Sequence, residues 1–151
     1  MSTAVVHDPL AKEKDEILAV IAGMKKARHD KNVRAMAAPY SADAAIFSLA
    51  PPLAHRGINI AETQAWLDGW EGPIEITAQD FEVRVSGDIA FCHGYMRMDG
   101  NKKGVDQRIS FWMRETLCLE RKDAGWQIVH EHTSVPFYMD GSLRPAFDLK
   151  P

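Results

Sequence analysis

The spacing of apolar residues divides the chain into a helical part and a strand part. Up to about residue 70, apolar positions recur every three or four residues, as they do along the buried face of a helix. After Pro73 the period changes to two, as on a strand with one buried face. The sequence therefore predicts an α+β domain in which helices precede an antiparallel sheet.

Three helices are predicted in the first part. Asp8 and Pro9 suit the start of the first helix, as a capping side chain and a first-turn proline. Its apolar stripe consists of Leu10, Ile17, Ile21 and Met24. A second, short helix is expected from 30 to about 40 and a third from about 58 to 70. Between them, "AAIFSLAPP" (44–52) indicates a short strand that ends at two prolines.

Four strands are predicted after Pro73, at residues 74–85, 89–98, 105–121 and 126–135. The apolar phase of the first slips between Ala78 and Phe81, which indicates a bulge or a strong bend. Turn residues separate the strands in "SGD", "DGNKKG" and "KDAG". We expect a curved, mainly antiparallel sheet with the three helices packed on its concave face. Such a sheet and its helices can enclose a cone-shaped cavity.

Length, composition and charge indicate one soluble globular domain. The chain has 151 residues, of which 46% are apolar and 26% charged, and its formal net charge of −3 gives no electrostatic reason to expect nucleic acid as a partner. No apolar run approaches the roughly 20 residues of a membrane span, and residues 1–16 do not resemble a signal peptide. Cys92 and Cys118 lie in apolar strands and are expected to be buried free thiols, which favours a cytoplasmic location.

Three motifs resemble a known superfamily. They are "GDIAF" (87–91), "RET" (114–116) and "DAGWQIVHEHTSVP" (123–136). Together with the order of elements they resemble the nuclear transport factor 2-like superfamily, in its SnoaL-like or ketosteroid-isomerase-like branch. The last two strands are also similar to the association domain of calcium/calmodulin-dependent kinases. The resemblance covers about residues 10–137 and implies a single domain over 1–151, folded as a cone-shaped α+β barrel. This fold hosts enzymes, binding domains and assembly modules alike.

The catalytic residues of ketosteroid isomerases are not found in this chain. Those enzymes use an Asp base together with a Tyr and a protonated Asp that stabilise the enolate. The corresponding positions fall near Ser48, Ala22 and Leu117. Alanine and leucine cannot donate a hydrogen bond, and a serine hydroxyl is too weak a base to remove a carbon-bound proton unaided. Steroid isomerisation by that mechanism is therefore not expected.

The resemblance also implies which face of each strand lines the cavity, because alternate residues point to opposite faces. The pocket residues implied in this way are Phe91, His93, Tyr95, Met113, Glu115, Leu117, Val129, Glu131 and Thr133. Separately, the aromatic side chains of Tyr40, Trp66 and Trp70 suit the open end of the cavity, where they would contact a planar or apolar ligand. For the three aromatic residues at the open end, packing between helix and sheet is an equally good explanation.

His93 and a carboxylate from Glu131 or Glu115 form the expected catalytic centre. Such a pair can act as a general acid and base or hold a polar head group. Two neighbouring carboxylates would also raise one of their pKa values. Two structural alternatives stay open, a core histidine at position 93 and a carboxylate that pairs with Arg97 or Arg114.

The opposite face of the sheet is expected to form a dimer interface. His130 and His132 alternate with Glu131 and would point away from the cavity, and Trp112 lies on the same outer side. Two histidines at this spacing lack the third or fourth ligand that a metal site needs, so no metal is expected. No glycine-rich phosphate loop is present either, and no cofactor is expected.

Two functions of different classes follow. The first is a small-molecule-binding SnoaL-like protein, acting as a cofactor-independent isomerase, cyclase or (de)hydratase on a small apolar or aromatic molecule with a polar group. The alternative is a non-catalytic oligomerisation or ligand-sensing domain. In both, we expect a homodimer without nucleic-acid or membrane partners.

Overall fold

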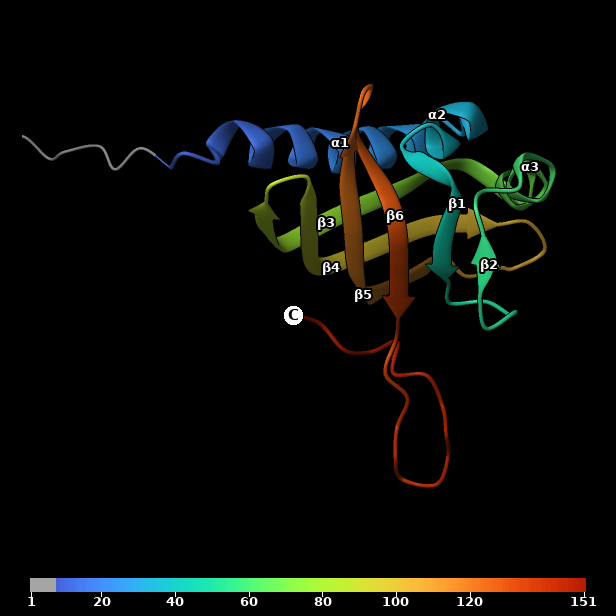
Figure 1. The fold of residues 1–151 in the computed structure, drawn as a ribbon. Coiled ribbons are helices and arrows are strands. Elements are labelled where there is room, and N and C mark those ends of the chain that lie inside the picture. Colours follow the sequence, from blue (N-terminus) through green and yellow to red (C-terminus); the bar gives the residue numbers. More distant parts are fainter. Residues whose placement is uncertain (1–7) are drawn as a thin grey trace, which may run out of the picture.

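The computed structural model describes residues 8–151 and has the predicted α+β architecture (Figure 1). The helices are α1 (Ala11–His29), α2 (Val33–Ala37) and α3 (Ile60–Asp68). The strands are β1 (Tyr40–Phe47), β2 (His55–Arg56), β3 (Trp70–Ser86), β4 (Ile89–Lys102), β5 (Ile109–Lys122) and β6 (Gly125–Ser134). Each predicted helix and strand is present, with shifted ends. The two-residue strand β2 was not predicted.

The six strands form one curved and open sheet in the order β2-β1-β6-β5-β4-β3. All neighbouring strands are antiparallel except β1 and β6, which are parallel. Figure 1 shows β3 and β4 running steeply across the direction of β5, β6 and β1, with α1 lying across one end of those strands. The sheet is therefore concave, and the helices lie on its hollow side.

The predicted bend in β3 is confirmed. The pairing of β3 with β4 shifts register between Gln79 and Glu82, and Asp80 adopts a left-handed backbone conformation with φ of 55°. The ring of Phe81 then lies over Gly94 of β4, where a Cβ atom would come within 2.5 Å of the ring. Gly94 is thus required by close packing at the point where the sheet curves.

Two clusters of buried side chains hold the helices on the sheet. In the first, Ile17, Ile21 and Met24 of α1 pack on Ala90, Cys92, Leu117, Leu119, Trp126 and Ile128. The second contains Leu67, Trp70, Ile74, Ile76 and Met96. Burying each large aliphatic side chain contributes about 1.5–3 kcal/mol. Phe81 packs against both clusters, and residues of each cluster, among them Met24 and Met96, line the cavity described below.

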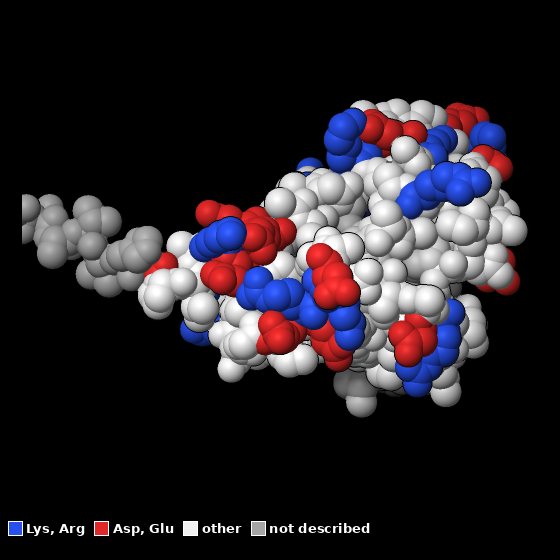
Figure 2. All heavy atoms as spheres, turned by 45° about the horizontal axis from the view of Figure 1, so that its top comes forward, with Lys and Arg blue, Asp and Glu red and all other residues white. Residues whose placement is uncertain are grey.

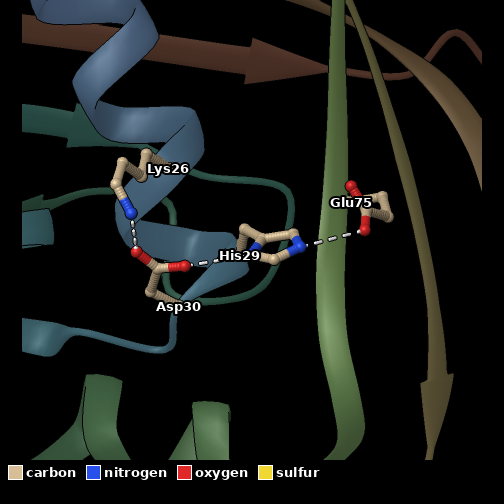
Figure 3. Close-up of polar contacts among 4 residues, drawn as sticks. All are labelled: Lys26, His29, Asp30 and Glu75. Carbon is tan, nitrogen blue, oxygen red and sulfur yellow. Dashed lines mark hydrogen bonds and ion pairs between the residues drawn. The ribbon is translucent and has the colours of Figure 1, made fainter.

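The C-terminal end of α1 is tied to β3 by a chain of polar contacts (Figure 3). Lys26 donates to Asp30, and the two ring nitrogens of His29 lie 3.0 Å from Asp30 and 3.2 Å from Glu75. The hydrogen bond to Asp30, helped by the charge of Glu75, raises the pKa of His29. All four side chains are substantially exposed, so this chain of contacts orients the helix more than it stabilises the fold.

Charges of both signs are interspersed on the face shown in Figure 2, without a large area of one sign. None of the helices within residues 8–151 is long and apolar enough to cross a membrane. After β6, the chain forms a loop held by a bridge between Phe137 and Pro145 and extends away from the sheet (Figure 1).

Gly94→Ala should lower the free energy of unfolding by about 1–3 kcal/mol, because the new methyl group must displace the Phe81 ring. Gly23→Ala is the control: its Cβ meets no atom within 4 Å, and alanine in a helix interior should raise stability by roughly 0.5–1 kcal/mol. Urea unfolding measures both. A Gly94→Ala protein as stable as the wild type would show that the ring does not occupy this position.

Candidate functional site

A cavity of about 510 Å³ lies between the helices and the concave face of the sheet. Its wall is mostly apolar and includes five of the seven methionines in the chain: Met24, Met36, Met96, Met98 and Met113. Methionine is flexible and polarisable, so such a wall can adapt to apolar ligands of different shape. The volume is in the range of pockets that take a small organic molecule.

Among the polar side chains that line this cavity, four from four different elements interact through their charges, and we call them the polar centre: Arg28, Tyr40, Glu115 and Glu131. Arg28 continues the buried stripe of α1 one turn after Met24, so helical periodicity points it toward the sheet. Tyr40 is the first residue of β1. Glu115 pairs with Thr133 and Glu131 with Leu117, which makes the two carboxylates diagonal neighbours on β5 and β6.

Tyr40 and Glu131 are directly bonded. The Tyr40 hydroxyl donates to Oε2 of Glu131. Burial raises the pKa of Tyr40 well above its usual value, and the charge of Glu131 adds to this effect while Arg28 opposes it. Tyr40 therefore keeps its proton at neutral pH and serves as a hydrogen-bond donor.

Glu115 is the most perturbed carboxyl group of the site. The residue is 2% exposed, and neither carboxyl oxygen has a hydrogen-bond partner within residues 8–151. Burial, assisted by the charge of Glu131 and opposed by Arg28, raises the pKa of Glu115 to about 7. Near neutral pH both protonation states are populated, which is the condition for efficient general acid–base catalysis.

Arg28 keeps its positive charge inside this cluster. Burial lowers the pKa of its guanidinium, but Tyr40, Glu131 and Glu115 more than compensate, so the net shift is upward. Those groups act at a distance, because the guanidinium donates no hydrogen bond to any side chain or carbonyl in the described part of the chain. The donors of Arg28 are thus available to a molecule in the cavity.

The mouth of the cavity is marked by lining residues that are exposed, among them Leu49, Asn59, Glu62 and Trp66. His55 of β2 lies beside them and is half-buried. Its Nδ1 is 3.2 Å from the carbonyl oxygen of Gly57. With a proton on Nδ1 donated to that carbonyl, Nε2 is left as an acceptor or a base.

Half of the twelve predicted pocket residues line the cavity: Tyr40, Trp66, Met113, Glu115, Glu131 and Thr133. Trp70 and Leu117 are instead buried in the two apolar clusters. Val129 is the additional residue of a bulge, since Cys118 pairs with His130 and Leu119 with Ile128, and it is not part of the cavity wall.

The predicted orientation of β4 is wrong. His93 pairs with Thr116 and lies on the outer face, where its Nε2 is 3.4 Å from Glu82 and its ring stacks on Phe91. Phe91 and Tyr95 are 45% and 40% exposed on the same face. Residues directly opposite each other share a face, and Gly94 is opposite Glu115, so the even-numbered residues of β4 point inward.

Arg28 and His55 are two lining residues with chemical potential that the sequence analysis missed. Arg28 could have been identified because it extends the 17–21–24 stripe of α1 by one further turn. His55 belongs to a strand too short to show a period, so no sequence pattern indicated it. The alternative of arginine partners for the carboxylates is also wrong, since Arg97 bonds to Asp99 and Arg114 to Ser134.

His130 and His132 lie on the outer face, as expected. Nδ1 of His130 is 2.7 Å from the carbonyl oxygen of Ala45, and the ring of Phe47 makes edge contacts with both imidazoles at 4.8 and 5.4 Å. Trp112 is on this side too, with the Arg97 guanidinium 5.7 Å from its ring centre. No three or more His, Cys, Asp or Glu side chains within residues 8–151 are placed to hold a metal ion.

Residues 17–138 match the family model described as the SnoaL-like domain. No functionally curated protein shows significant sequence similarity to the chain.

Several solved structures have the same fold. A nuclear transport factor 2-like protein of unknown function from Pseudomonas putida KT2440 is 27% identical, with a TM-score of 0.81 over 93% of this chain and 97% of that one. A proposed dehydratase from Streptomyces avermitilis is 14% identical, with a TM-score of 0.70 over 82% and 95% of the two chains. A proposed calcium/calmodulin-dependent protein kinase II association domain from Xanthomonas campestris is 19% identical, with a TM-score of 0.70 over 89% and 96%.

Glu115→Gln should change the free energy of unfolding more favourably at pH 8 than at pH 5. The folded-state pKa of Glu115 is above the unfolded value of 4.5, so the wild type loses stability as pH rises from about 4.5 through 7. The shift corresponds to a difference on the order of 3 kcal/mol, which glutamine removes because it does not ionise. Urea unfolding at both pH values measures it, with the exposed Glu71→Gln as control. If Glu115→Gln changed the free energy of unfolding equally at the two pH values, the raised pKa of the buried Glu115 carboxyl would be contradicted.

Proposed function

The chain belongs to the SnoaL-like family, and we propose that its cavity binds a small apolar or aromatic molecule that carries a polar group. The observation behind this proposal is the combination of a largely apolar wall with one cluster of polar side chains, which is the usual composition of a small-molecule site. Trp66 at the mouth and the methionines would contact the body of the ligand, and the polar centre would contact its polar group.

We further propose that the protein catalyses proton transfer on this ligand without a cofactor, as an isomerase, cyclase or (de)hydratase. Glu115 has the proton affinity that an acid–base catalyst needs at neutral pH, and Glu131 lies beside it. Arg28 and Tyr40 would stabilise negative charge that develops on a ligand oxygen. A structural neighbour described as a proposed dehydratase is compatible with this class of reaction.

Hydrogen–deuterium exchange tests the proposed chemistry even when the product of the reaction is not identified. Apolar ketones and enones are incubated with the protein in D₂O, and loss of carbon-bound protons next to the carbonyl is followed by NMR. We expect catalysed exchange for at least one compound and a decrease of about 10²- to 10⁴-fold in Glu115→Gln or Glu131→Gln. Glu82→Gln, an exposed carboxyl on the outer face, should exchange like the wild type. Equal rates in all four proteins would exclude the two carboxylates as catalysts.

The alternative, an assembly domain, is favoured by the outer face of the sheet. Phe47, Phe91 and Tyr95 expose 39%, 45% and 40% of their surface there, next to His130, His132 and Trp112. We propose that this face forms a homodimer; exposed aromatic groups of this kind are common in interfaces. A structural neighbour described as a proposed kinase association domain is compatible with such a role.

His132→Glu should convert this dimer to a monomer, because each subunit would then bury a negative charge in the aromatic surface of the proposed interface. Light scattering across a concentration series measures the molecular mass. Leu53→Glu, a change at a fully exposed loop residue, should leave the dimer intact. A monomeric wild type, or a dimeric His132→Glu protein, would contradict the proposed interface.

The cytoplasmic location expected from the sequence remains part of the proposal. Cys92 and Cys118 are free thiols, and burial raises the pKa of Cys92 to about 12. Unpaired, unreactive cysteines suit a reducing compartment.

A further inference from the structure

The polar centre contains one group whose charge cannot be removed by a proton. A buried carboxyl such as Glu115 avoids the cost of its charge by protonation, and Glu131 receives a hydrogen bond from Tyr40. The guanidinium of Arg28 stays charged at any physiological pH and has five N–H donors. Within the described residues none of these donors has an acceptor.

The polar centre therefore has room for a group that accepts hydrogen bonds from Arg28. Glu115 needs no additional cation, because protonation removes its charge. With Glu115 protonated, Arg28 and Glu131 balance each other and the polar centre is neutral. An incoming carboxylate can accept two parallel hydrogen bonds from a guanidinium, which is the strongest pairing available to that group. A protonated Glu115 can accommodate this additional negative charge, whereas an ionised one would repel it.

We propose that Arg28 anchors the carboxylate of an apolar organic acid in the cavity, and that Glu115 takes up a proton from solvent when this anion binds. This inference rests on the proposed function, since it requires the cavity to be a ligand site, and it specifies the class of ligand. The apolar body would lie along the methionine wall and under Trp66.

Proton uptake follows from the groups that surround Glu115. The titratable or charged groups that face it or share its cavity are Arg28 from α1, Tyr40 from β1, His55 from β2, Glu62 from α3, Cys92 from β4 and Glu131 from β6. A bound carboxylate adds a negative charge near Arg28, which raises the pKa of Glu115 above its ligand-free value of about 7. By linkage, the acid must bind more tightly at lower pH as long as the ligand itself stays ionised.

Matched series of one apolar body and three head groups test this inference by isothermal titration calorimetry. The probes are cinnamate, cinnamamide and cinnamylamine, with octanoate, octanamide and octylamine as the aliphatic series. For the wild type we expect a carboxylate to bind more tightly than its amide, and about tenfold more tightly at pH 6 than at pH 8. Titrations in buffers of different ionisation enthalpy should show uptake approaching one proton per ligand at pH 8. The amides should bind independently of pH.

Three variants separate the two residues. Arg28→Met should weaken carboxylate binding at least tenfold and leave amide binding within about twofold, and Arg28→Lys should retain part of the preference because it keeps the charge. Glu115→Gln should still bind the carboxylate but lose its pH dependence and its proton uptake. Arg34→Met, on the exposed side of α2, is the control and should behave like the wild type.

Each other outcome overturns the inference in a recognisable way. Amides that bind as tightly as acids would leave the cavity as a ligand site and exclude the anion anchor. Tighter binding of the amines would mean that the acidic groups select the ligand. Carboxylate binding without proton uptake would exclude Glu115 as the coupled group. Failure of every probe to bind would contradict the proposed function as well.

Discussion

The candidate site depends on one guanidinium and two carboxyl groups that are placed together below the surface of the protein. Charges in such surroundings are costly unless they are paired or neutralised. Here the charge of Arg28 balances that of Glu131, Tyr40 donates to Glu131, and Glu115 is left with a proton affinity near neutrality. A stable fold would be obtained more easily with apolar residues at these positions, so their presence indicates a function.

The curvature of the sheet makes this arrangement possible. The bulge in β3 and the close contact of Phe81 with Gly94 bend the sheet opposite the helices. Members of both apolar clusters line the cavity, so packing holds its wall in place. Polar side chains from α1, β1, β5 and β6 line this cavity. The parallel pairing of β1 with β6 brings Tyr40 close enough to donate to Glu131.

Periodicity was sufficient to predict the fold but not the face of every strand. The helical stripe of α1 and the bulge in β3 follow from the spacing of apolar residues, and the inward positions of Glu115 and Glu131 were implied by the family resemblance. His93 was misplaced because the face of β4 was assigned by resemblance, although Ala90, Cys92 and Met96 form the more apolar set and occupy the core. Three members of the polar centre were predicted as pocket residues, but the bond from Tyr40 to Glu131 and the part played by Arg28 could not be predicted, since they depend on long-range pairing and on the mutual effect of buried charges. Arg28 was overlooked because a charged residue at the end of a helix is usually solvated.

The central claim is that Glu115 is buried beside Glu131 without a hydrogen-bond partner and titrates near neutrality. An NMR titration of the side-chain carboxyl carbons in ¹³C-labelled glutamate, assigned with the Glu115→Gln protein, measures this directly. We predict that the Glu115 resonance has a midpoint near pH 7, about where its pKa is placed by burial and the neighbouring charge. A midpoint near 4.5, the ordinary value for glutamate, would contradict this claim.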